Sequence, residues 1–140
     1  MLIVDIVMAT FNGENYLEEQ LLSIEDQTYP QWRLTVRDDG SSDRTMDILN
    51  RFRQRMGNDK VRIVRNDPPS GSGKNNFMGL LKDCEGRYIM CCDQDDIWHP
   101  DKIQKTLACM RKMEKRYGAR APLMVHTDLR VVNEALHELH

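Results

Sequence analysis

The stretch that decides the fold is YIMCCDQDDIW, residues 88–98. Its first five residues are largely apolar, which predicts a buried strand, and three carboxylates follow within the next four positions. Ligands of open α/β sheets bind outside the carboxyl ends of the strands. Crowded carboxylates repel each other unless a cation or solvent relieves them, and hard oxygen ligands suit Mg²⁺ or Mn²⁺. The alternative interpretation is a solvated acidic turn that caps the next helix.

A second strand, predicted at residues 32–37, ends in the same way. Asp38 and Asp39 follow it, and the next residues, GSSD at 40–43, provide a tight turn and several possible helix caps. A carboxylate here could accept the ring N3–H of uracil or thymine, which cytosine lacks, as a charge-assisted hydrogen bond. Two isolated acids would usually be a turn and a cap, but a second acidic cluster two β-α steps later favours a binding site.

Strands and helices alternate along the whole chain. This alternation predicts an α/β fold of three layers, with a mostly parallel sheet and helices on both faces. The predicted strands are residues 2–8, 32–37, 61–65, 87–92 and 122–127, and the predicted helices are 14–26, 44–56, 74–83 and one that begins near Pro100.

The length and composition narrow the class of protein. A chain of 140 residues suits one domain, and its net charge of -2 gives no indication of nucleic acid or of an anionic membrane as a partner. Residues 2–8 are too short for a membrane span and lack the basic flank of a signal peptide. The four cysteines show no C-x-x-C spacing, which favours buried thiols in a reducing cytoplasm over disulfides or zinc.

The glycine-rich segment before the predicted helix 74–83 superficially suggests a phosphate loop. A Walker sequence would need glycine where Pro68 stands and serine or threonine where Asn75 stands. The segment is therefore interpreted as a flexible connection, from which Lys74 could still reach a diphosphate.

Several motifs in order resemble those of family 2 glycosyltransferases, and they cover nearly the whole chain. The resemblance is closest to bacterial enzymes that build cell-surface polysaccharide, including rhamnosyltransferase-like members. The motifs are VMATFNG at 7–13, LSI at 22–24 with QTYP at 27–30, DDGSSD at 38–43, and DQDDIW at 93–98 with PDKI at 100–103.

This resemblance implies a GT-A fold, a nucleotide-sugar donor, a divalent metal (Mn²⁺ or Mg²⁺) and inversion at the anomeric carbon. It also implies the site residues. Thr10, Phe11 and Asn12 would lie against the nucleotide, and Asp39 would bind the pyrimidine with Asp38 beside it. Lys74 would lie near the donor. Asp93 would lie near the ribose and the sugar, with Asp96 as a neighbour, and Asp95 would bind the metal.

Two departures from the family pattern matter. Phe11 stands where tyrosine is commoner, so stacking is kept but a hydroxyl contact is lost. The family continues well past this length, and no residue after Asp128 matches the motif of the general base. Residues 1–140 are therefore expected to be a donor-binding part, truncated at the C-terminus, without the acceptor half.

The expected function is transfer of a sugar from a UDP- or dTDP-linked donor to a saccharide or lipid-linked acceptor in cell-surface polysaccharide synthesis. The expected location is the cytoplasm, with the full-length protein peripheral at the inner membrane face. One alternative is a nucleotide-sugar binding fragment without transferase activity. The other is a nucleotidyltransferase, which would ordinarily carry a glycine-rich activation loop where residues 9–13 stand.

Overall fold

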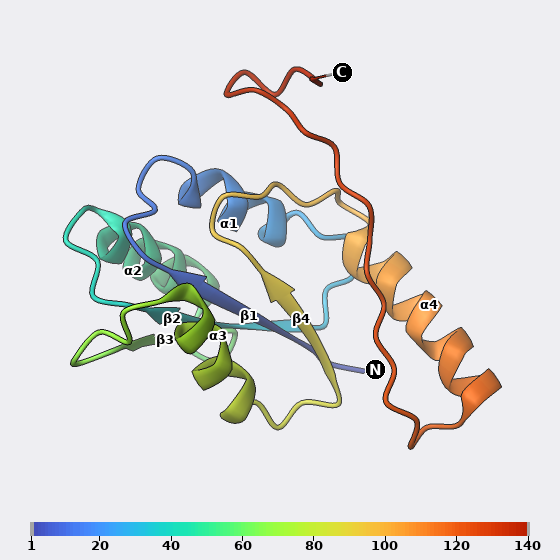
Figure 1. The fold of residues 1–140 in the computed structure, drawn as a ribbon. Helices are drawn as coiled ribbons and strands as arrows, with labels where there is room; N and C mark the ends of the chain where they lie inside the picture. Colours follow the sequence, from blue (N-terminus) through green and yellow to red (C-terminus); the bar gives the residue numbers. More distant parts are fainter. Residues whose placement is uncertain (1, 140) are drawn as a thin grey trace. The chain divides into compact units, whose positions relative to one another are not determined.

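The computed structural model describes residues 2–139, and in this part of the chain strands and helices alternate (Figure 1). Each strand is joined to the helix that follows it by a loop, and these loops carry most of the motifs named in the sequence analysis. The elements are β1 Val4–Thr10, α1 Leu17–Glu25, β2 Trp32–Asp38, α2 Thr45–Met56, β3 Val61–Arg65, α3 Gly73–Lys82, β4 Tyr88–Cys92 and α4 Lys102–Tyr117.

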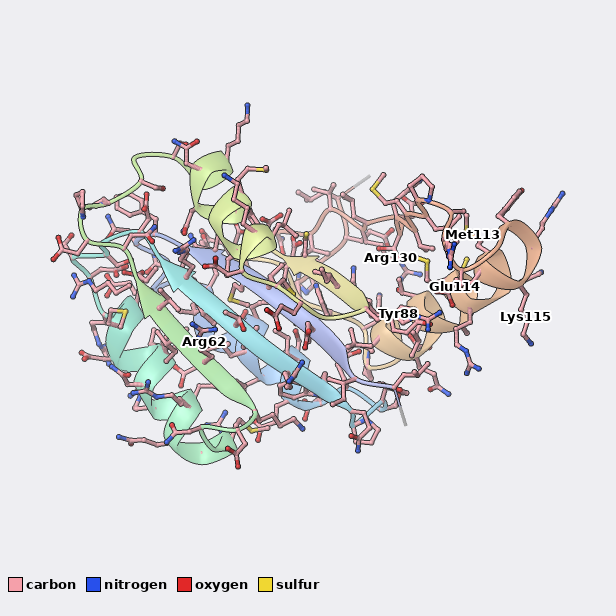
Figure 2. The ribbon with its side chains drawn as sticks, turned by 90° about the horizontal axis from the view of Figure 1, so that it is seen from below. Arg62, Tyr88, Met113, Glu114, Lys115 and Arg130 are labelled. Carbon is pink, nitrogen blue, oxygen red and sulfur yellow. The ribbon has the colours of Figure 1, made fainter. Side chains whose placement is uncertain are left out.

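The four strands form one parallel sheet in the order β3-β2-β1-β4. Helices α1 and α2 lie on one face of this sheet and α3 lies on the other (Figure 2). The predicted three-layer α/β architecture with a parallel sheet is thus confirmed. Because β2 and β4 both pair with β1 in the same direction, the carboxyl ends of these three strands meet at one edge.

The burial of the strands follows their place in the sheet. Central β1 is almost continuously buried, as an apolar strand covered on both faces should be. Its neighbour β2 alternates instead, so that Trp32, Leu34 and Val36 are buried while Arg33 is exposed. One face of β2 therefore packs into the core and the other carries polar side chains.

Two buried polar side chains, one in α1 and one just after it, hold the segment that follows the acidic residues after β4. The Ser23 hydroxyl accepts a hydrogen bond from the Trp98 amide at 3.0 Å. The Gln27 side chain donates to the His99 carbonyl at 2.7 Å and accepts from the Ile103 amide at 3.0 Å. Satisfying these buried groups determines how the chain leaves β4.

The chain divides into two compact units, one ending at Ile103 and the other beginning at Gln104. The first unit holds the sheet and the helices α1 to α3. The second holds most of α4 and an irregular segment with an isolated bridge between Val132 and Glu138. Among the described residues, no helix combines the length and the hydropathy that crossing a membrane requires.

Two sequence predictions were wrong. Residues 122–127 form no strand, and Met124 is 80% exposed, because an apolar run becomes a strand only where a neighbour completes its backbone hydrogen bonds. Burial of the cysteines holds for Cys92 but not for Cys91 and Cys109, which are exposed. Cys91 lies on β4, an edge strand of this sheet, where the local apolar run does not guarantee a cover.

Candidate functional site

A cavity of about 520 Å³ lies at the carboxyl edge of the sheet. The loops after β1, β2 and β4 line it, together with the loop that leads into α3. Among the predicted site residues, it is lined by Thr10, Phe11, Asp39, Asp93 and Asp95, whereas Asn12, Asp38 and Lys74 do not line it. The remaining lining includes Pro69, Asn76, Phe77 and Gln94, which the sequence analysis did not assign.

Asp38 is fully buried behind the cavity wall. Its carboxylate accepts hydrogen bonds from the Thr10 hydroxyl at 3.0 Å, from the Ser41 hydroxyl, and from the amides of Gly40 and Ser41 at 3.1 and 2.9 Å. These bonds tie the end of β1 to the turn after β2. We therefore expect Asp38 to act on a ligand indirectly, by holding this turn.

Asp39 faces the cavity but is bound by the loop that precedes α3. Oδ1 accepts hydrogen bonds from Asn66 Nδ2 at 2.7 Å and from the Ser70 amide, and Oδ2 accepts one from the Gly71 amide at 3.1 Å. Burial favours a raised pKa for Asp39, but these hydrogen bonds outweigh it and the pKa is lowered. The Ser70 side chain also contributes to lowering this pKa, so the loop before α3 surrounds the carboxylate.

The loop after β1 is held through consecutive backbone amides, which donate to side chains of the segment after β4 and of the segment after β2. Asn12 has a φ of 46°, a left-handed conformation that asparagine tolerates better than most residues. Its side-chain oxygen accepts from the Ser42 amide at 3.0 Å. The amides of residues 11 to 14 donate, in order, to Gln94 Oε1, Ser41 Oγ, Thr45 Oγ1 and Asp43 Oδ2.

The acidic cluster after β4 has a different environment. The carboxylates of Asp93, Asp95 and Asp96 accept no hydrogen bond and form no ion pair with other residues in 2–139. Burial, followed by the charges of Asp96 and Asp95, raises the pKa of Asp93. Unpaired, mutually repelling oxygen ligands suit a divalent cation. The described residues contain no group of three such side chains placed to hold a metal ion together.

Lys74 is exposed in the first turn of α3, which Ser72 caps by accepting from the Asn75 amide. Behind it, Asn76 is buried, accepts from Asn66 and donates to the Arg37 carbonyl at 2.8 Å. The sequence analysis assigned no role to Asn66, which it placed in a loop, or to Asn76, which it placed in the predicted helix 74–83.

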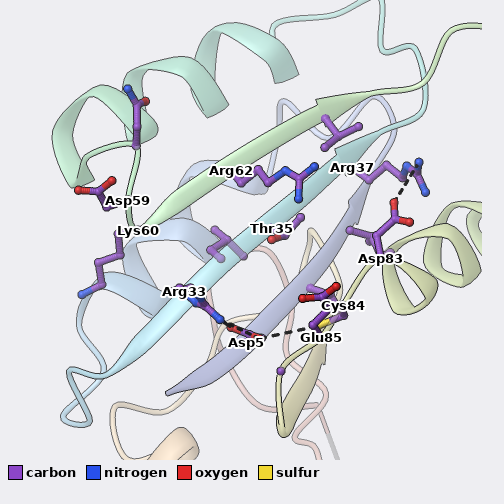
Figure 3. A pocket seen from close by; sticks show the side chains of 16 residues that line it. Asp5, Arg33, Thr35, Arg37, Asp59, Lys60, Arg62, Asp83, Cys84 and Glu85 are labelled. Carbon is purple, nitrogen blue, oxygen red and sulfur yellow. Dashed lines mark hydrogen bonds and ion pairs between the residues drawn. The ribbon is translucent and has the colours of Figure 1, made fainter. Parts of the chain in front are cut away.

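A second hollow, of about 450 Å³, lies over the polar face of the sheet (Figure 3). Two ion pairs cross it: Arg33 binds Asp5 at 2.9 Å, and Arg37 approaches Asp83 at 3.6 Å. No residue predicted for the site lines this hollow, and its charged groups largely offset each other. The edge cavity is therefore the candidate site.

Known structures share the fold of this chain. It superposes on the crystal structure of TarS from Staphylococcus aureus residues 1–349, in complex with UDP, with a TM-score of 0.68 and 26% sequence identity. The match covers 80% of this chain and 32% of the TarS 1–349 chain. The confirmed α/β architecture is thus shared with a protein whose structure contains a bound nucleotide.

Two relatives resemble the chain in sequence. It is 38% identical to the dTDP-rhamnosyl transferase RfbG of Shigella flexneri, over 74% of this chain and 36% of RfbG. It is 33% identical to the UDP-Glc:alpha-D-GlcNAc-diphosphoundecaprenol beta-1,3-glucosyltransferase WfgD of Escherichia coli, over 79% of this chain and 42% of WfgD. The chain thus spans well under half the length of either relative. The model of the family described as Glycosyl transferase family 2 matches residues 5–120, and the chain belongs to this family.

Proposed function

We propose that residues 1–140 form the donor-binding part of an inverting glycosyltransferase. The donor is a UDP- or dTDP-linked sugar, and the acceptor is a saccharide or lipid-linked saccharide in cell-surface polysaccharide synthesis. The observation that carries this proposal is the edge cavity, where a hydrogen-bonded acid and an aromatic ring share one space with unpaired carboxylates. The names of RfbG and WfgD, which specify dTDP, UDP and a diphosphoundecaprenol acceptor, support these substrate classes.

The base of the nucleotide would bind between the loops after β1 and β2. The Phe11 side chain is 56% exposed and lines the cavity, so its ring is available to stack on a base. Asp39 Oδ2, which accepts a hydrogen bond from the Gly71 amide at 3.1 Å, would also accept the N3–H of uracil or thymine. Cytosine has no such donor, and it would place an acceptor against a carboxylate.

The diphosphate would lie toward the acidic cluster after β4. Asp95 would hold Mn²⁺ or Mg²⁺, and Asp93 would lie near the ribose and the sugar. The cation, when bound, offsets the negative charge of the diphosphate leaving group. Lys74 approaches the same ligand from the start of α3 in this proposal.

The general base and the acceptor surface lie outside residues 1–140 in this proposal. The chain covers 36% of RfbG and 42% of WfgD, which leaves room for both in proteins of that length. Inversion requires a base within hydrogen-bond reach of the acceptor hydroxyl, and its removal commonly costs about 10²–10⁴-fold in rate. We therefore expect this chain to bind the donor but not to transfer its sugar.

Calorimetry of the chain with UDP, dTDP, CDP and GDP, with and without Mn²⁺, tests the donor site. We expect UDP or dTDP to bind more tightly than CDP and GDP, and chelation of the metal to weaken binding. Equal affinity for all four nucleotides would contradict the assigned base pocket. As a control, Asp59→Asn changes an exposed acid outside the edge cavity, and this variant should bind the four nucleotides like the parent chain.

Incubation with donors and candidate acceptors, followed by mass spectrometry of the products, tests the placement of the base. Slow hydrolysis of the donor by water is compatible with the proposal, because water needs no acceptor pocket. Glycoside formation above about 1 s⁻¹, an ordinary enzymatic rate, would show that the base lies within this chain. Nucleotide binding without any transfer or any hydrolysis of the donor would favour a binding module instead.

A further inference from the structure

We propose that Gln94 is a positioning residue for the donor, which acts by fixing Phe11 against the acidic segment. This inference rests on the proposed function. The side-chain amide of Gln94 pairs with the backbone of Phe11 at two points: Oε1 accepts from the Phe11 amide at 3.0 Å, and Nε2 donates to the Phe11 carbonyl at 3.1 Å. Two parallel bonds fix both the distance and the orientation of the loop.

The position of Gln94 gives this pairing its importance. It stands between Asp93 and Asp95, whose carboxylates have no hydrogen-bond or ion-pair partner within residues 2–139. All three residues line the edge cavity together with Phe11. Gln94 therefore joins the wall that would bind the diphosphate to the wall that would bind the base.

Phe11 depends on this support because of how its loop is held. The residues that follow it are tied to the segment after β2, where the Asn12 amide donates to Ser41 at 2.9 Å and the Gly13 amide to Thr45 at 2.8 Å. The amide and the carbonyl of Phe11 are both bound by Gln94 instead. Loss of Gln94 would leave the aromatic residue without its tie to the β4 side of the cavity.

Gly13 makes room for the Gln94 side chain. A Cβ atom added at Gly13 would lie 2.5 Å from Gln94 Oε1 and 2.7 Å from its Cδ, well inside van der Waals contact. Gly13 has no positive φ, so alanine would not strain its backbone. Gly13→Ala is thus an independent way to displace the same side chain, at a residue that makes no contact of its own with a base.

A double-mutant cycle on UDP affinity in the presence of Mn²⁺ tests the proposal. We expect Gln94→Ala and Gly13→Ala each to weaken UDP binding about tenfold, which corresponds to ~1.4 kcal/mol. Because both break one contact, the double variant should be no more than about threefold weaker than either single variant. Independent losses that multiply to about a hundredfold, or an unchanged affinity for Gln94→Ala, would overturn the proposal.

Gln94→Leu keeps most of the side-chain volume without either hydrogen bond, and it should reproduce the loss seen with Gln94→Ala. It takes the place of Gly13→Ala if that variant does not fold, and wild-type affinity for Gln94→Leu would then overturn the proposal. Gln54→Ala, at an exposed position on α2, is the matched control and should bind UDP like the parent chain.

Amide hydrogen exchange in the ligand-free chain separates this inference from the proposed function. Gln94→Ala should accelerate exchange of the Phe11 amide at least about tenfold while the Gly13 amide keeps its protection. If the parent chain binds no nucleotide, the proposed function fails although the exchange result still shows the tie. If exchange at Phe11 does not change, Gln94 does not hold this loop. Faster exchange with unchanged UDP affinity would refute positioning of the donor.

Discussion

The acidic clusters at the end of β2 and after β4 occupy equivalent places in the fold but have opposite surroundings. Asp38 and Asp39 accept hydrogen bonds from the loops around them, and the pKa of Asp39 is lowered. Asp93 and Asp95 receive no such bonds within residues 2–139, and the pKa of Asp93 is raised. The protein itself satisfies the first cluster, while the carboxylates of the second have no partner among the described residues.

This difference teaches that one sequence pattern serves two purposes. An acid at the end of a parallel strand can organise the turn that follows it, as Asp38 does, or it can remain unpaired at the cavity, as Asp95 does.

Asp38→Ala should produce the largest change. It would leave the Thr10 and Ser41 hydroxyls and two backbone amides without their acceptor, and each unsatisfied buried group costs about 1–3 kcal/mol. We expect the free energy of unfolding in urea to fall by at least ~3 kcal/mol. Asp59→Ala, at an exposed position, should change it by less than ~0.5 kcal/mol. If Asp38→Ala lowers the free energy of unfolding by less than ~1 kcal/mol, Asp38 does not organise the turn after β2.

Asp95→Asn should abolish the metal-dependent part of UDP binding without destabilising the protein. We expect the affinity gained on adding Mn²⁺, measured by calorimetry, to fall roughly a hundredfold. In EDTA the melting temperature should stay unchanged or rise, because one of three crowded acids loses its charge. A marked loss of stability in EDTA would instead indicate that Asp95 has a structural role like that of Asp38.

Asp39→Asn should reduce the preference for UDP over CDP roughly tenfold or more. In the proposed pocket a charge-assisted hydrogen bond to the ring N3–H would contribute about 1.5–3 kcal/mol, and of the two bases only uracil offers that donor. The ratio of the two dissociation constants is the relevant measurement, because any movement of the loop that Asp39 holds affects both nucleotides. An unchanged ratio would show that Asp39 serves the loop alone.

Asp93→Asn should produce the smallest effect, a change in melting temperature. Its direction should be opposite to that of the change in melting temperature caused by Asp39→Asn. A raised pKa means that the folded protein holds the proton more tightly than the unfolded chain, so stability falls as the pH rises through that pKa. Removing the charge of Asp93 should therefore raise the melting temperature slightly at pH 7 in EDTA, and the difference should vanish near pH 3.

The lowered pKa of Asp39 predicts the opposite dependence of stability on pH. Its stabilising contribution is present above the ordinary value of 3.8 and is lost as the pH falls through the lowered pKa. Asp39→Asn should therefore lower the melting temperature at pH 7. Equal shifts of the same sign for the two variants would contradict the contrast between the clusters.

The sequence by itself determined the alternation of elements and the edge at which the acids gather. Apolar runs such as that before Asp93 have the length and composition of buried strands, and parallel pairing then brings the acids that follow them to one edge. The motifs at residues 7–13, 38–43 and 93–98 also identified the family, which the comparisons confirm. These properties are local in the chain or follow from the general geometry of parallel sheets.

Only the tertiary structure decided which acids are already satisfied and which residue holds Phe11. The partners of Asp39 lie 27 to 32 residues away, and Gln94 lies 83 residues from Phe11. The failure of residues 122–127 to form a strand likewise depends on whether a neighbour is present to pair with. Hydrogen bonds between distant segments depend on how loops approach in space, and local periodicity carries no information about that approach.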